Sequence, residues 1–291
     1  MTDKNNQPSD KVGVIGAGQM GRGIAQVFAS GGFQVVLCDV NAAVLDSAKK
    51  DILLSLKKLA EKNQLKQNVD DIFRLIEFCP KLDGIKHCQW VMEAILEDLT
   101  AKKNLYQELK NIFATSSDWV LASNTSSFLI RTLQNYSPNP KNFFGVHFMN
   151  PPALMPLVEI ILTPLTDPTL GDMMKQMVEK KLAKQAVLVK DSSGFLLNRL
   201  LLPYLNEAVK LLDNNIASRD DIDKVMMLGA GYKMGPFALL DFIGLDICKT
   251  ALDNMAQDTG YEHYRPCQLL CDLVEAGHLG RKSKKGFYDY Q

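Results

Sequence analysis

The sequence carries no excess of charge of either sign, because its 33 lysine and arginine residues are balanced by 33 aspartate and glutamate residues. Bulk attraction to nucleic acid or to an anionic membrane surface relies on a positive excess, so we expect neither partner. The sequence also lacks any apolar run near the roughly 20 residues that a membrane-spanning helix needs. Hydrophobic residues at 46% and charged residues at 23% are typical of a soluble globular protein.

Cysteine is sparse, and its six occurrences show no CxxC spacing, so a disulfide scaffold is not expected in 291 residues. Metal and serine-hydrolase motifs are missing as well: His87, His263 and His278 are scattered, and neither HExxH nor GxSxG occurs. Residues 1–10 are polar and contain no apolar signal core, and we expect them to be a disordered lead-in. We therefore expect free thiols, no metal and a cytoplasmic location.

The hydrophobic pattern changes near residue 190 and divides the chain into two predicted domains. Residues 11–190 alternate short β-branched or aromatic runs with amphipathic helices, a pattern typical of an α/β domain with a doubly wound, mostly parallel sheet. The predicted strands are Lys11–Ile15, Phe33–Cys38, Trp90–Glu93, Trp119–Ala122, Phe143–His147 and Leu157–Ile161, with Val187–Val189 as a further candidate. The predicted helices are Arg22–Ser30, Ala42–Lys66, Leu99–Ile112 and Thr169–Lys181.

Residues 191–291 are predicted to form an all-helical C-terminal domain, because apolar residues recur there at helical spacing without strand-like alternation. Several large apolar faces of this domain must be covered, which predicts a homodimer formed through the helical domain. The predicted helices are Gly194–Asn214, Asp220–Leu228, Pro236–Gln257 and Gln268–Ala276.

The most informative motif is a glycine-rich turn between the first predicted strand and the following helix, Gly16-Ala17-Gly18-Gln19-Met20-Gly21. In a dinucleotide-binding βαβ unit, the first glycine permits the tight turn and the second lets a pyrophosphate approach the backbone. The third allows close packing of helix and strand, and the N–H groups of the helix N-terminus bind the phosphates. The motif in this context predicts a Rossmann-type domain.

Asp39 follows the second predicted strand, 18 residues after Gly21. A carboxylate at this place accepts hydrogen bonds from the adenosine ribose, whereas a 2′-phosphate would meet like charge, so NAD is favoured over NADP. The alternative is a glycine-rich turn followed by an unrelated surface aspartate. The order of strand, turn, helix and strand favours the cofactor site.

His147 ends a predicted strand, and Glu159 lies in the next apolar strand, 12 residues later. A carboxylate in such a strand must be paired or hydrogen-bonded. The pair can act as a base and its orienting partner, since the glutamate fixes the tautomer and stabilises the imidazolium. A strand-end histidine on a backbone carbonyl, with the glutamate in an ion pair at the sheet edge, explains the residues equally well.

Two further polar segments allow a functional and a structural interpretation. Residues 123–127, Ser-Asn-Thr-Ser-Ser, follow a predicted strand and can hold a substrate oxygen or the nicotinamide end, or they can cap the next helix. Asn198 lies on an otherwise apolar helix at the start of the second domain. It can cap a neighbouring element or reach a substrate across the cleft between the domains.

The predicted helix Ala42–Lys66 is longer than a crossover between strands requires. Ser55 and Lys62 lie beside its apolar stripe, within about 20° of each other at helical period. They can approach one anionic group together, but the residues alone favour a solvated, lysine-rich face.

Together these motifs resemble the L-3-hydroxyacyl-CoA dehydrogenase family, particularly its short bacterial 3-hydroxybutyryl-CoA dehydrogenase branch. The resemblance extends from Lys11 to Tyr290. The motifs that carry it are Val14–Gly21, Glu93–Asp98, Ala122–Ser127, His147–Pro151, Leu157–Glu159, Lys190–Phe195, Asn198–Arg199 and Gly280–Ser283 with Gly286–Tyr288.

The resemblance implies an NAD-dependent dehydrogenase that acts on acyl-CoA thioesters, with His147 as catalytic base and Glu159 as its orienting partner. It implies that Ser126 and Asn198 contact substrate oxygens and that Ser55 and Lys62 contact coenzyme A. It also implies that NAD has further contacts, which are Glu97, Lys102, Ser126, Asn150 and Lys282. Of these residues, Lys102 and Ser126 would contact the substrate as well.

Two other functions remain open. One is a dehydrogenase of another hydroxyacid or of a hydroxyacyl thioester on a carrier protein. The other is an NAD-binding protein without catalytic activity, against which the presence of His147, Glu159, Ser126 and Asn198 argues.

Overall fold

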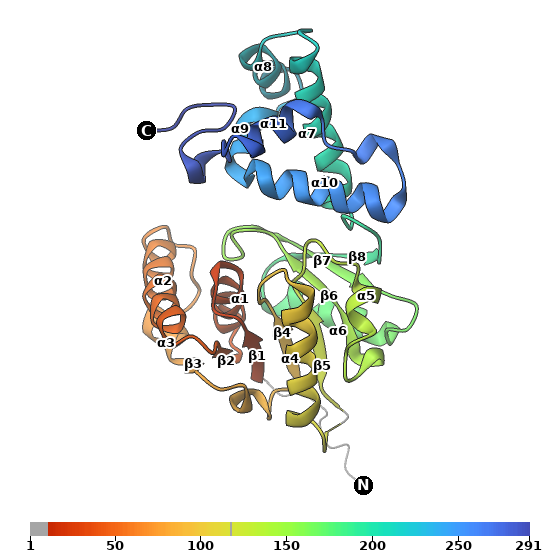
Figure 1. Cartoon of the computed structure of the whole chain (residues 1–291). Helices are drawn as coiled ribbons and strands as arrows, with labels where there is room; N and C mark the ends of the chain where they lie inside the picture. Colours follow the sequence, from red (N-terminus) through yellow and green to blue (C-terminus); the bar gives the residue numbers. More distant parts are fainter. Residues whose placement is uncertain (1–10, 117) are drawn as a thin grey trace. The chain divides into compact units, whose positions relative to one another are not determined.

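The computed structural model describes residues 11–116 and 118–291, so the predicted lead-in at residues 1–10 lies outside the described residues. The chain divides into two compact units, which meet in sequence between Asp191 and Ser192 and which we describe separately (Figure 1). No helix in the described ranges has the length and apolar character needed to cross a membrane.

The first unit is built on an eight-stranded sheet in the order β3-β2-β1-β4-β5-β6-β7-β8. Neighbouring strands are parallel except for the antiparallel pair β6 and β7, which confirms the predicted doubly wound, mostly parallel sheet. The strands are β1 (Lys11–Ile15), β2 (Gln34–Cys38), β3 (Ile76–Cys79), β4 (Trp90–Glu93), β5 (Val120–Ser123), β6 (Phe143–Phe148), β7 (Leu157–Leu162) and β8 (Gln185–Lys190).

Helices cover both faces of this sheet. The helices of the first unit are α1 (Gln19–Ser30), α2 (Ala42–Glu61), α3 (Val69–Arg74), α4 (Leu99–Ile112), α5 (Ile130–Gln134) and α6 (Pro168–Gln176), which continues as a π-helical turn over Met177–Lys181. Two short 3-10 turns, Leu82–Ile85 and Pro140–Asn142, complete it.

Strand pleating decides which side chains face which helices, because successive residues point to opposite sides of a sheet. Val12, Val14, Trp90 and Met92 belong to the core that α1, α2 and α6 share. The alternate residues face the other side, where Tyr106 of α4 packs edge-on against Phe143. Four buried polar strand residues of the described chain fall on this second side: Glu93, Ser123, His147 and Glu159.

Several elements of the first unit differ from the sequence prediction: the short helices α3 and α5 are not among the predicted helices, and α2 and β3 differ as follows. The helix predicted to reach Lys66 ends at Glu61, because Asn63 adopts a left-handed conformation (φ 54°). The N–H of Gln64 then bonds to the carbonyl of Leu59, the pattern that closes many helices. Strand β3 is not among the predicted strands; it is a four-residue edge strand in which only Ile76 is buried, which leaves a weak hydrophobic signal.

The second unit is helical, as the sequence predicts, and packs around a core that includes Leu205, Val209 and Leu252. The predicted single helix Pro236–Gln257 is two helices, since Gly244 (φ 108°) breaks the chain between them. The helices are α7 (Leu197–Asp213), α8 (Arg219–Gly229), α9 (Pro236–Ile243), α10 (Leu245–Thr259) and α11 (Gln268–Glu275), with 3-10 turns at Glu262–Tyr264 and Arg281–Ser283.

Two buried aspartates hold the C-terminal segment onto these helices. Asp241 accepts hydrogen bonds from the N–H groups of Phe287 and Tyr288, each 2.8 Å long. Asp223 accepts bonds from the backbone of α9 at Phe237 (2.8 Å) and from the Tyr288 hydroxyl (3.0 Å). Buried carboxylates with this many donors fix an irregular segment that has little apolar area of its own.

Candidate active site

The glycine-rich turn joins β1 to α1 at the carboxyl edge of the sheet. A Cβ at Gly16 (φ 94°) would lie 2.5 Å from the carbonyl oxygen of Ala94, and one at Gly21 would lie 1.7 Å from that of Gly16. Gly18 is different, because nothing lies within 4 Å of a Cβ placed there. Gly16 and Gly21 are therefore required by packing, while Gly18 leaves open space beside the backbone.

The N-terminus of α1 has the features of a phosphate site. Its N-cap residue is Gly18, no side chain caps the helix, and its first turn contains no acidic residue. The first N–H groups and the positive end of the helix dipole therefore face outward without a competing carboxylate. These are the features that bind a dinucleotide pyrophosphate in such domains, and the segment expected to do so consists of Gly16, Ala17, Gly18, Gln19, Met20 and Gly21.

Asp39 follows β2 and binds the glycine turn directly. Its Oδ2 accepts a hydrogen bond from the N–H of Ala17 (2.8 Å), and its Oδ1 accepts one from Asn41 (2.9 Å). Each carboxylate oxygen can accept a second bond. The structure therefore assigns Asp39 a structural part that the sequence did not indicate, and it leaves lone pairs for ribose hydroxyls.

His147 and Glu159 stand opposite each other in the antiparallel pair of β6 and β7. The Nδ1 atom of His147 lies 2.8 Å from Oε2 of Glu159, and the two residues are 8% and 1% exposed. The carboxylate favours the tautomer with the proton on Nδ1, which makes Nε2 the basic nitrogen. The structure thus pairs the two side chains with each other, which is the arrangement that a base and its orienting partner require.

Of the two interpretations given for residues 123–127, capping of the next helix is wrong, because the N–H groups of Ile130 and Arg131 at the start of α5 bond to Asp191 instead. Thr125 Oγ1 accepts bonds from the N–H groups of Ser127 (3.2 Å) and Phe128 (3.0 Å), so Thr125 shapes the turn before α5. Ser126 instead faces Glu97: its N–H donates to Glu97 Oε1 at 2.7 Å, and its hydroxyl lies 3.4 Å from the same atom.

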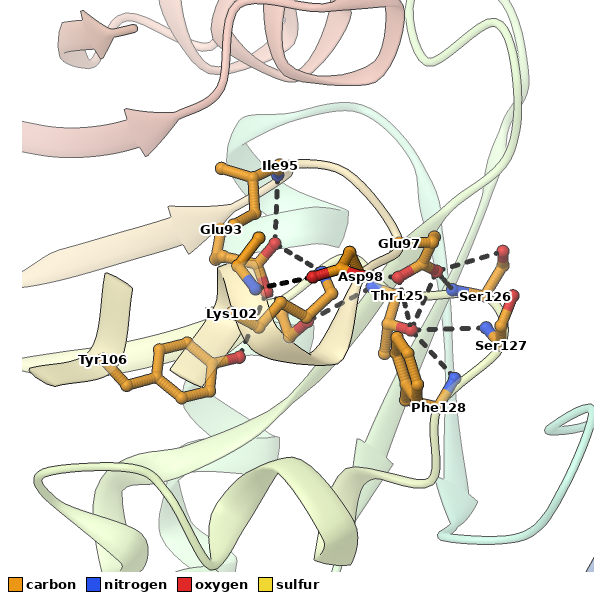
Figure 2. A network of polar contacts seen from close by, with 12 residues as sticks. Glu93, Ile95, Glu97, Asp98, Lys102, Tyr106, Thr125, Ser126, Ser127 and Phe128 are labelled. Atoms are coloured by element: carbon orange, nitrogen blue, oxygen red, sulfur yellow. Dashed lines mark hydrogen bonds and ion pairs between the residues drawn. The ribbon is translucent and has the colours of Figure 1, made fainter. Parts of the chain in front are cut away.

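Lys102 was predicted to touch ligands, yet its side chain is 1% exposed. Its Nζ lies 2.7 Å from Glu93 Oε1 and 3.3 Å from Glu97 Oε2. Glu93 also accepts hydrogen bonds from Tyr106 and Ser123, and the group forms one network that leads to Ser126 (Figure 2). Sequence reasoning did not select Glu93, although a glutamate at the end of a buried strand requires partners.

The remaining predicted residues of the first unit lie nearer the surface. Gln19 donates to the side chain of Asn150 at 3.0 Å, which joins the glycine turn to the end of β6. Ser55 is half-buried on α2, and Lys62 is exposed at the residue that caps its C-terminus. The glycine turn, Asp39, Glu97, Ser126 and Asn150 all follow the carboxyl ends of parallel strands, where ligands of such sheets bind.

Asn198 and Lys282 belong to the second unit. Asn198 is a half-buried residue in the first turn of α7, and Lys282 lies in the turn Arg281–Ser283, where its Nζ pairs with Asp246. Within residues 11–116 and 118–291, no group of three His, Cys, Asp or Glu side chains has the arrangement of a metal site.

Comparison with protein families and known proteins gives a consistent result along the chain. Residues 11–192 match the NAD-binding domain of 3-hydroxyacyl-CoA dehydrogenase, and residues 194–290 match its C-terminal domain. A probable 3-hydroxybutyryl-CoA dehydrogenase of Deinococcus radiodurans is 43% identical over 280 residues, which span 96% of this chain and 100% of that protein. The human mitochondrial hydroxyacyl-coenzyme A dehydrogenase is 40% identical over 96% of this chain and 91% of its own.

Solved structures agree. The crystal structure of FadB2 from M. tuberculosis has a TM-score of 0.93 at 37% identity and covers 98% of this chain and 100% of its own. That of (S)-3-hydroxybutyryl-CoA dehydrogenase from Ralstonia eutropha has a TM-score of 0.91 at 35% identity, with 97% and 99% covered.

Replacing Asp39 tests its part in cofactor choice. Asp39→Ala removes the acceptor for ribose hydroxyls and the charge that opposes a 2′-phosphate, so NADH should bind roughly 10–100-fold more weakly. NADPH affinity should change far less, as measured by fluorescence titration. Asn41→Ala, which removes the cap of α2 in the same turn, should shift both affinities alike. An unchanged NADH-to-NADPH ratio in Asp39→Ala would show that another residue reads the ribose.

Proposed function

Because the chain belongs to the 3-hydroxyacyl-CoA dehydrogenase family, we propose that it interconverts short-chain 3-hydroxyacyl-CoA and 3-oxoacyl-CoA, such as 3-hydroxybutyryl-CoA and acetoacetyl-CoA, with NAD as the hydride carrier. The observation that carries the proposal is the buried pair of His147 and Glu159 at the edge of the sheet that bears the glycine turn. A protein that only bound NAD would have no use for a base held in this way.

In the oxidative direction, Nε2 of His147 accepts the proton of the 3-hydroxyl group. The single bond between C3 and this oxygen then becomes the double bond of the 3-oxo group. Glu159, 2.8 Å from Nδ1, stabilises the imidazolium that forms. NAD, when bound, takes up the hydride that leaves the substrate carbon C3. In the reductive direction, the imidazolium of His147 returns the proton to the oxygen.

The other predicted residues receive binding parts in this proposal. Ser126 and Asn198 hold substrate oxygens, and Ser55 and Lys62 contact the coenzyme A moiety. Lys102, predicted as a contact of NAD and substrate, is almost fully buried and supports Glu97 beside them. NAD is held by the glycine turn and by Asp39, Glu97, Ser126, Asn150 and Lys282.

We assign the helical unit to dimerisation as well. Leu200, Val225 and Leu228 on α7 and α8 are 69%, 64% and 75% exposed, although they are large and apolar. A second copy of the chain would cover such residues. Sedimentation velocity should therefore report twice the 32.4 kDa of one chain, and a monomer at micromolar concentration would contradict the assignment.

A cytoplasmic location fits the state of the cysteines. All six are free thiols, and burial raises the pKa of the Cys88 thiol to about 11 and that of Cys248 to about 12. Thiols of this kind stay protonated and unreactive in a reducing compartment. Cell fractionation would test the location.

The substrate class is tested by the reduction of acetoacetyl-CoA with NADH, followed as the loss of absorbance at the NADH band. Free acetoacetate and the same acyl group on a carrier protein serve as competitors, and we expect the coenzyme A thioester to have the highest kcat/KM. Turnover of the carrier-bound thioester or the free acid alone would replace the proposed substrate. No turnover of any of them would leave only an NAD-binding protein.

Lys62→Ala extends this test to the nucleotide end of coenzyme A. Loss of a lysine that binds a phosphate removes binding common to ground and transition states, so KM for acetoacetyl-CoA should rise several-fold while kcat stays nearly unchanged. A truncated thioester without the nucleotide should show no such change. Lys57→Ala, at an exposed lysine of the same helix, is the matched control. Equal KM changes for both thioesters would mean that Lys62 acts on the fold.

The acid–base pair is tested by His147→Ala, which should lower kcat by roughly 10²–10⁴-fold, the usual effect of losing a general base. Glu159→Gln should also lower kcat, because a neutral amide stabilises an imidazolium poorly. NADH affinity should hardly change in either variant, and His87→Ala, at an exposed histidine, should behave as the wild type. Wild-type turnover in His147→Ala would show that the base is another residue.

A further inference from the structure

Glu93 is the most completely buried acidic side chain of the first unit, with 0% of it exposed. Its Oε1 accepts hydrogen bonds from Lys102 Nζ (2.7 Å) and the N–H of Ile95 (3.0 Å). Its Oε2 accepts bonds from the hydroxyls of Ser123 (2.7 Å) and Tyr106 (3.1 Å). Four donors therefore fill the acceptor positions of this carboxylate and fix its orientation.

The two hydroxyl donors come from elements on either side of Glu93. Ser123 stands next to it across the parallel pair of β4 and β5, and Tyr106 lies on α4. Burial, with the negative charge of Glu93 beside it, raises the pKa of Tyr106 well above its ordinary value. The phenol therefore remains protonated and donates to the carboxylate at any pH at which the protein would be assayed.

Lys102 connects Glu93 to Glu97, because its Nζ lies between the carboxylates of these two residues. It is 2.7 Å from Glu93 Oε1 and 3.3 Å from Oε2 of Glu97, whose side chain is 35% exposed. The other oxygen of Glu97 accepts bonds from the Ser126 N–H (2.7 Å) and the Thr125 hydroxyl (2.8 Å). The network thus runs from a dry interior to a serine at the edge of the sheet (Figure 2).

Stability alone does not account for this ion pair. Moving two charges into the protein interior costs about as much as their attraction returns, and an apolar pair of similar volume often stabilises a fold as well or better. The ion pair instead provides a buried cation, Lys102, beside the partly exposed carboxylate of Glu97. Because Lys102 holds Oε2 of Glu97, the carboxylate group is oriented and Oε1 points towards Ser126.

We propose that Glu93 and Lys102 are positioning residues that orient the Glu97 carboxylate and, through it, Ser126. The proposal rests on the function proposed above, in which Ser126 contacts both the substrate and NAD. Lys102 is suited to this part because only 1% of its side chain is exposed and its Nζ lies between the two carboxylates. Tyr106 and Ser123 belong to the same network, because their hydrogen bonds hold the Glu93 carboxylate in the orientation that binds Lys102.

Removing both charges separates positioning from folding. Glu93→Gln leaves Lys102 without its buried carboxylate and Lys102→Met leaves Glu93 without its cation, so each should lower the thermal midpoint. The double variant Glu93→Gln/Lys102→Met contains no unpaired buried charge and should recover most of that loss. Its kcat/KM for acetoacetyl-CoA should nevertheless stay roughly 10–100-fold below the wild type, because Oε2 of Glu97 has lost the lysine that orients it and small displacements of positioning groups are costly.

The dissociation constant for NADH, measured by fluorescence titration, is a second measure that does not need turnover. It should rise several-fold in the double variant despite the recovered midpoint. Recovery of the midpoint together with wild-type kcat/KM and NADH affinity would overturn the proposal, because the pair would then serve only the fold. A wild-type protein inactive on all thioesters would instead refute the proposed function, and the NADH titration would still decide on the network.

Asp223→Asn is the matched control, since Asp223 is a buried carboxylate of the helical unit with its own backbone and hydroxyl donors. It should lower the thermal midpoint and leave kcat/KM and NADH affinity unchanged. Should the double variant fail to fold, Tyr106→Phe decides on the same two measures. It keeps both charges and removes one donor from Glu93, so a few-fold loss supports the proposal and wild-type values overturn it.

Discussion

The antiparallel pairing of β6 with β7 is the constraint on which the site depends. In a sheet that is otherwise parallel, this one reversal sets His147 directly opposite Glu159 and brings their side chains to the same face. A shift of β7 by one residue would turn Glu159 to the opposite face, towards the core shared with α1, α2 and α6 and away from His147. The pair of His147 and Glu159 is therefore as well fixed as the sheet itself, and the loops do not need to position it.

The parallel part of the sheet supplies the rest by a different rule. Strands β1, β2, β4, β5 and β6 all end at one edge, so segments far apart in sequence deliver the glycine turn, Asp39, Glu97, Ser126 and Asn150 to the same place. Several of these groups also bind each other, as Asp39 does with Ala17 and Gln19 with Asn150. Binding residues that hold one another in position lose less entropy when a ligand arrives.

Much of this could be predicted from the sequence, because it depends on short-range patterns. β1 and α4 have the predicted bounds, and the pairing of His147 with Glu159 followed from the cost of leaving a carboxylate unpaired in an apolar strand. Long-range and backbone effects were harder to predict. The break at Gly244 depends on one residue's φ angle, and the partners of Glu93 lie 9, 13 and 30 residues away, a spacing that no local periodicity reveals.

Glu159 and Glu93 are both buried glutamates of the first unit, but the groups around them differ. Glu159 faces His147, and in the proposed function its negative charge would stabilise the imidazolium that forms during the reaction. Glu93 accepts hydrogen bonds from a lysine and from three neutral donors, so its charge fixes a single arrangement of these groups. Both carboxylates lie on the same face of the sheet and are almost fully buried, so they differ only in the groups that face them. Under the two proposals made above, the identity of the facing donor, more than burial, decides whether a buried carboxylate in this fold takes part in chemistry or in positioning.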